Sequence, residues 1–122
     1  MKKFYFRLDP VIRYRKYLEQ TAQIKLAAAE QAVADCIKEI DSLNTSRRIF
    51  SKELEHEEKK GIDIHTYRMH KLYIEKIDRD IESERQRLKE SIMNRDRKRD
   101  DLKAASTKKK SLARLKDIKQ LR

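Results

Sequence analysis

The chain has 122 residues, of which 43% are charged, and its formal net charge is +11 with one Gly, one Pro and one Cys. So few turn-forming residues argue against a fold with many loops, and the regular spacing of the apolar residues argues against disorder. A single Gly also excludes the phosphate-binding patterns GxxxxGK[ST] and GxGxxG, since each needs at least two glycines. The remaining class is a long helix or a coiled coil.

The first predicted helix covers about residues 10–58. Asp9 and Pro10 form its start, because Asp can cap free N–H groups and Pro fits the first helical position. Further along, residues recur at alternating spacings of four and three, which is typical of a coiled-coil seam. They are Ala22, Leu26, Ala29, Val33, Cys36, Ile40, Leu43, Arg47, Phe50 and Leu54. Upstream, Leu18 and Val11 continue this seam if Arg15 occupies a seam position, where it would fix the register.

The segment 59–63 is the predicted turn. Gly61 can take the left-handed conformation that ends a helix. Asp63 can cap a second helix over about residues 64–120, and Ile62 can pack on Tyr67 at its start.

The second helix carries apolar residues at helical spacing, namely Tyr67, Ile74, Ile77, Ile81, Leu88, Ile92 and Leu102. Two long helices joined by so short a turn lie antiparallel, and folding about the turn pairs positions whose numbers add to roughly 121. Ile40 is then expected to face Ile81, and Val33 to face Leu88. We therefore predict an all-α fold, a single domain of two long helices in an antiparallel coiled-coil hairpin. A dimer of extended helices would show the same spacing.

The charge is concentrated at the two ends of the sequence. Residues 1–16 carry a net charge of +5 and residues 95–122 carry +8, which leaves −2 for residues 17–94. A hairpin brings both basic ends to the side opposite the turn, together with Phe4 and Phe6. Such a basic, aromatic end is expected to attract an acidic protein surface. The alternatives are a solvated end that keeps the protein soluble and a nucleic-acid-binding surface.

Three stretches of the sequence resemble a known family. The chain begins with the pattern Phe4-x-Phe6-Arg7-Leu8-x-x-Val11-Ile12-x-x-Arg15-x-x-x-Glu19, followed by an Ala-rich amphipathic helix. Gly61-Ile62 precedes an aromatic-rich segment, and residues 110–116 read KSLARLK. Together these features resemble the FliJ family of flagellar export proteins. Members commonly continue into a tail that contains acidic residues, so we expect this sequence to stop short of such a tail.

The resemblance implies a non-enzymatic component of type III protein export, similar in fold to the central stalk of rotary ATP synthases. Family members bind the hexameric export ATPase and promote its assembly and activity. They also contact the membrane-embedded export gate and bind export chaperones, and relatives serve virulence injectisomes. The expected location is the cytoplasm, at the inner face of the membrane at the flagellar base, with no cofactor and no nucleic acid.

Two sets of candidate site residues follow. The ATPase-binding tip is predicted from the residues of both chain ends and comprises Phe4, Phe6, Arg7, Val11, Arg15, Lys110, Leu112, Arg114 and Leu115. The resemblance places docking to the export gate on an exposed face early in the second helix. The matching positions are Tyr73, Ile77, Asp80 and Glu84.

The remaining reactive residues predict no catalytic or metal centre. Cys36 is expected to be a small buried hydrophobe on the seam, and a lone Cys excludes an internal disulfide and a CxxC metal site. His65 and His70 are five residues apart and so do not share a helix face. No run of 18 apolar residues predicts a transmembrane span, although the cations of residues 108–122 could attract anionic lipid.

Overall fold

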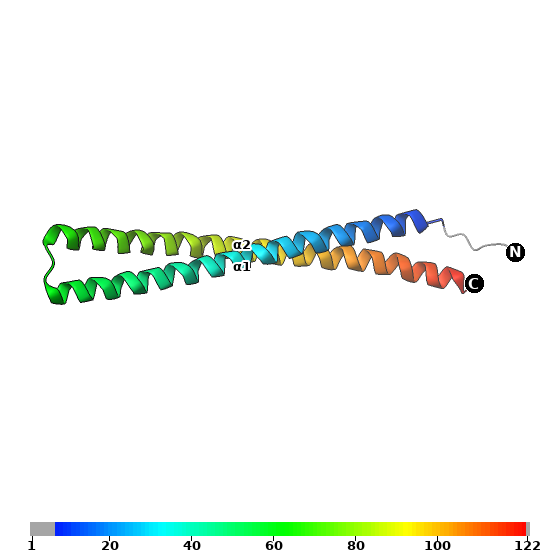
Figure 1. Ribbon diagram of the computed structural model, residues 1–122. Helices are drawn as coiled ribbons and strands as arrows, with labels where there is room; N and C mark the ends of the chain where they lie inside the picture. The colour runs from blue at the N-terminus through cyan, green and yellow to red at the C-terminus, as the bar shows by residue number, and fades with distance from the viewer. Residues whose placement is uncertain (1–6, 122) are drawn as a thin grey trace. The chain divides into compact units, whose positions relative to one another are not determined.

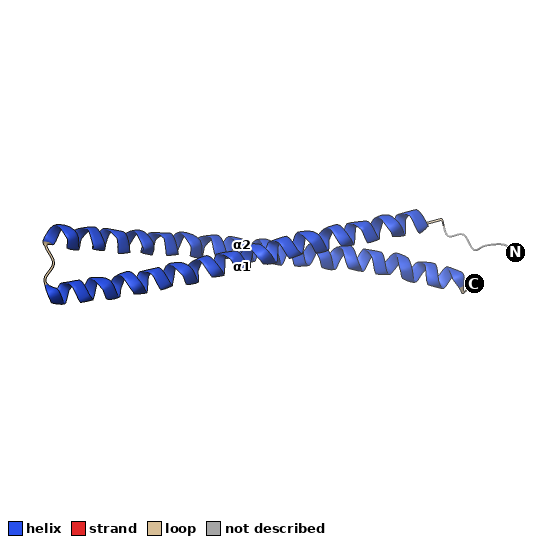
Figure 2. Cartoon of the chain, in the orientation of Figure 1, coloured by secondary structure: helices blue, strands red, loops and turns tan. Residues whose placement is uncertain are grey.

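A computed structural model of the chain describes residues 7–121. Two long helices account for nearly all of this range, α1 (Asp9–Lys60) and α2 (Ile64–Gln120) (Figure 1). Between them lies a short loop, drawn in tan in Figure 2. The predicted all-α antiparallel hairpin is confirmed. α1 starts one residue before its predicted start and ends two residues beyond its predicted end.

Two residues of the loop define the helix boundaries: Gly61 ends α1, and Asp63 caps the start of α2. Gly61 has a φ of 87°, a left-handed conformation that costs a residue with a side chain more than it costs glycine, and its N–H donates to the carbonyl oxygen of Glu58 at 3.2 Å. The carboxylate of Asp63 then accepts a hydrogen bond from the backbone N–H of Thr66 at 2.7 Å. This hydrogen bond lowers the pKa of Asp63. Both predicted roles, the left-handed glycine and the helix cap, are therefore confirmed. Packing of Ile62 on Tyr67 stays a prediction.

The described chain divides into two compact units, each made of one segment of α1 beside one segment of α2. Unit 1 combines residues 7–31 with residues 93–121, and unit 2 is the continuous segment 32–92 that contains the loop. The assignment of the chain to a single domain stays a prediction.

The apolar core of unit 2 follows the predicted seam. Its buried side chains are Val33, Cys36, Leu54, Ile74, Ile77 and Ile81. Cys36 is 7% exposed and unpaired with another cysteine, as expected of a small buried hydrophobe. Burial of these residues stabilises the pair of helices because it removes apolar surface from water.

The pairing register of the two helices differs from the predicted one. Phe50 packs edge-to-face on Tyr73 with ring centroids 4.6 Å apart, and the Sγ of Cys36 lies 3.8 Å from the Oγ of Ser91. The numbers of these partners add to 123 and 127, which exceed the expected sum of roughly 121 by two and by six. Part of this difference arises because α1 continues to Lys60, which moves the centre of the loop to Ile62 and the sum for paired residues to about 124.

Candidate functional site

One end of unit 1 joins the start of α1 to the last turns of α2. The carboxylate of Asp9 forms an ion pair with Lys116, with 2.9 Å between Oδ1 and Nζ. The carbonyl of Leu8 accepts a hydrogen bond from the N–H of Ile12 at 2.8 Å, which closes the first turn of α1. Residues far apart in the sequence therefore lie at one end of the same unit.

Most residues of the predicted ATPase-binding tip lie on the surface at this end. Arg7, Lys110 and Arg114 are exposed, while Arg15 and Leu112 are half-buried. Two apolar members, Val11 and Leu115, are each 38% exposed. Phe4 and Phe6 lie outside the described residues. The described part of the tip thus combines exposed cations with partly exposed apolar side chains.

A buried polar cluster lies further inside unit 1, and sequence reasoning missed it. Glu19 is 9% exposed, and its carboxylate accepts hydrogen bonds from the Oγ of Ser106 at 2.7 Å and the Nζ of Lys109 at 2.9 Å. These bonds, with the Ser106 bond first in importance, lower the pKa of Glu19. A signal was present in the sequence, because Glu19 lies four residues after Arg15 and three before Ala22. Continuing the alternation of four and three through Glu19, instead of through Leu18, would have placed it on the seam.

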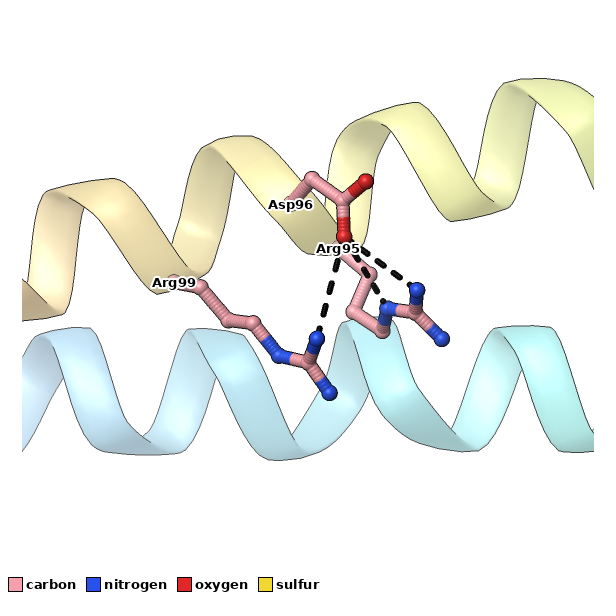
Figure 3. Close-up of polar contacts among 3 residues, drawn as sticks. All are labelled: Arg95, Asp96 and Arg99. Carbon is pink, nitrogen blue, oxygen red and sulfur yellow. Dashed lines mark hydrogen bonds and ion pairs between the residues drawn. The ribbon is translucent and has the colours of Figure 1, made fainter.

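The net charge of the chain is held by unit 1. Residues 1–31 and 93–122 contain 19 Lys and Arg against 7 Asp and Glu, a net charge of +12, whereas residues 32–92 carry −1. Asp96, one of these seven acidic residues, lies between two of the cations (Figure 3). One carboxylate oxygen of Asp96 lies 3.2 Å from Nη2 of Arg95 and 3.9 Å from Nη1 of Arg99. The net positive charge produces a positive field that favours an acidic partner.

The four positions expected at the export gate do not form an exposed face, which corrects the surface predicted for them. Ile77 is only 4% exposed, since it belongs to the apolar seam of unit 2. Asp80 and Glu84 are half-buried, and Glu84 forms an ion pair with Arg87 at 3.0 Å. Of the four, Tyr73 is the most accessible at 46% exposed.

Next to the loop, unit 2 has a shallow apolar groove. It is lined by Phe50, His65, Thr66, Met69, His70 and Tyr73. Met69 is 59% exposed, while His70 is half-buried with its Nε2 3.2 Å from a carboxylate oxygen of Glu57. Within residues 7–121, no group of three or more His, Cys, Asp or Glu side chains is arranged to hold a metal ion.

The sequence as a whole was compared with known families and proteins. The profile of the family described as Flagellar FliJ protein matches residues 3–122. The chain belongs to the FliJ family. It is therefore a component of flagellar protein export, and the FliJ family is a non-catalytic part of that system. A search of curated proteins found no match, and a search of solved structures found none either. Over the described part of the chain, neither helix has a stretch apolar enough to cross a bilayer.

Proposed function

We propose that this FliJ-family chain is a non-enzymatic stalk, whose basic end docks into the hexameric export ATPase and promotes its assembly and activity. The observation that carries the proposal is the composition of the end of unit 1 at which α1 begins. There, exposed Arg7, Lys110 and Arg114 accompany partly exposed Val11 and Leu115.

The chemistry of this end suits a ring of repeated acidic loops. Arginine binds carboxylates through two parallel hydrogen bonds, and a water-excluding contact strengthens such pairs. Apolar side chains such as Val11 and Leu115 fill the gaps between the charged contacts. The Asp9–Lys116 ion pair and the Glu19 cluster hold the two helices together at this end, so the cations are presented from a defined pair of helices.

The test measures ATP hydrolysis by the cognate export ATPase with and without the full chain. The triple variant Arg7→Glu, Lys110→Glu, Arg114→Glu should lose most of the stimulation, because like charges then face the acidic loops. Stimulation by the unmodified chain should also fall as the salt concentration rises, since the contact is largely electrostatic. The chain alone should hydrolyse no ATP.

A matched control replaces three exposed lysines of unit 2 with Glu, which changes the net charge by the same amount. These residues are Lys38, Lys52 and Lys76. This control should stimulate the ATPase like the unmodified chain. Equal loss in both triple variants would show a general charge effect and would contradict docking through this end. Tight binding to duplex DNA at physiological salt, with no binding to the ring, would favour a nucleic-acid-binding function instead.

The family resemblance supports two further partners, the export gate and empty export chaperones. Because Ile77 is buried, gate docking on early α2 would have to use more accessible neighbours, such as Tyr73. These contacts would place the chain at the inner face of the membrane at the flagellar base. Alanine substitution of Tyr73, followed by a pull-down with the gate's cytoplasmic domain, tests this part of the proposal separately.

A further inference from the structure

Unit 1 has a row of exposed apolar side chains on α1 that includes no residue of the proposed tip and none of the buried seam. Tyr14 is 56% exposed, Tyr17 is 62% exposed and Ile24 is 71% exposed, and Ala28 is exposed as well. We call these four residues the outer stripe. Exposed apolar side chains that follow one another along one line of a helix form a continuous surface, and such surfaces mark sites of protein–protein contact.

The spacing of the outer stripe is that of a second helix-packing seam. With Thr21, the residues follow one another at intervals of three, four, three and four. The hydroxyl of Thr21 donates to the carbonyl of Tyr17 at 3.0 Å, so this polar atom is already satisfied within α1. An alternation of three and four places side chains along one line of an α-helix and suits packing against another helix. The buried seam uses different residues of α1, among them Glu19 and Ala29.

The charges beside the outer stripe are of one sign. Arg13 and Lys25, which directly flank the stripe, are both exposed, and so is Lys16 of the same segment. Between residues 7 and 28 the two acidic residues, Asp9 and Glu19, form ion pairs with Lys116 and Lys109 of α2. In coiled coils, the charges that flank an apolar seam select the partner, so a seam flanked by cations selects a helix flanked by carboxylates.

We propose that the outer stripe binds an amphipathic helix of another protein, with acidic residues on both sides of its apolar face. The distance from Tyr14 to Ala28 along α1 is about 20 Å, which matches a partner helix of about four turns. The Tyr rings supply apolar contact area and a hydroxyl that can reach the polar rim. This inference does not rest on docking to the ATPase, because the stripe contains none of the proposed tip residues.

The test uses the full chain and a synthetic helical peptide as the probe. The peptide has about three heptads with Leu at positions a and d, Glu at e and g, and a fluorescent label. Fluorescence anisotropy should show binding that weakens at least about tenfold in the Tyr17→Ser, Ile24→Ser double variant. The Arg13→Glu, Lys16→Glu variant should also weaken it. Both variants should keep the helical circular dichroism of the unmodified chain, because all four side chains are exposed.

Two controls isolate the stripe. Leu72→Ser removes an apolar side chain that is 61% exposed but lies in unit 2, and it should leave peptide binding unchanged. A second peptide with Lys in place of Glu should bind much more weakly. The proposal is overturned if the Glu peptide does not bind, if the stripe variant binds it as the unmodified chain does, or if both peptides bind equally. Dimerisation of the chain that is lost in Ile24→Ser would also overturn it, because a second copy would then cover the stripe.

Discussion

The two units of this hairpin stabilise the same pair of helices by different means. Unit 2 buries six apolar side chains along its seam and carries a net charge of −1. In the described part of unit 1, Ala29 is the one buried apolar side chain, and the buried carboxylate of Glu19 lies on the same helix. Residues 1–31 and 93–122 together carry a net charge of +12.

This difference indicates that the two units contribute differently to the stability and to the alignment of the helix pair. An apolar seam gives stability with little demand on the exact partner, because hydrophobic contact is not directional. A buried carboxylate with two specific donors tolerates few alternative alignments, since a shifted register would leave it unpaired. Unit 2 therefore contributes most of the hydrophobic stabilisation, while unit 1 fixes the pairing register of its helix segments and carries most of the positive surface charge.

The largest expected effect is the loss of an apolar contact in unit 2. Ile77→Ala should lower the free energy of unfolding by about 3 kcal/mol, because it removes buried methyl groups and leaves a cavity. Urea denaturation followed by circular dichroism measures this change. Ile37→Ala, at a side chain that is 47% exposed, is the control and should cost much less. Equal costs in the two variants would contradict a core centred on Ile77.

A smaller effect of opposite sign is expected from a covalent link across unit 2. Ser91→Cys places a second thiol beside Cys36, whose Sγ lies 3.8 Å from the hydroxyl that is replaced. Under oxidising conditions we expect a disulfide within one chain that stabilises the hairpin by about 2 kcal/mol. Non-reducing electrophoresis and thermal melting measure its formation and its effect. A disulfide that forms mainly between chains would contradict the observed register.

The smallest expected effect is the pH dependence of unit 1. The pKa of Glu19 is lowered in the folded chain. Ionised Glu19 therefore adds to the free energy of unfolding at any pH above its unfolded pKa of about 4.3. This stabilisation is lost as the pH falls through the lowered pKa of the folded chain. Glu19→Gln should therefore destabilise the chain at pH 7 and have a much smaller effect in strong acid. Thermal melts of both proteins across this range measure the difference. If Glu19→Gln lowered the melting temperature equally at every pH, the result would contradict an ionised Glu19 in the folded chain.

Much of the fold follows from short-range patterns in the sequence. The alternation of three and four marks Val33, Cys36 and Leu54 as buried, and the structure buries them. Gly61 and Asp63 mark the loop because few other residues suit a left-handed turn or a helix cap. Such local rules need no knowledge of the partner helix.

The errors arise where a contact depends on the pairing of distant residues. Ser106 is 87 positions from Glu19, so their hydrogen bond could be predicted only from a correct register. The register in turn depends on the centre of the loop, and an error of one or two residues there displaces every pair by up to a helical turn. The family resemblance assigns Ile77 to an exposed face, whereas its helical spacing with Ile74 and Ile81 favours the burial that the structure shows.

The ion pair between Asp9 and Lys116 also has a practical consequence for anyone who labels this protein. A fluorescent or affinity tag attached at the first turn of α1 or the last turns of α2 would lie beside the exposed cations of this end and would shield them from binding partners. Insertion of a small tag between Gly61 and Asp63 would instead use the loop of unit 2, where residues 61 and 63 are exposed. Binding assays with such an internally tagged chain would leave the start of α1 and the end of α2 unmodified.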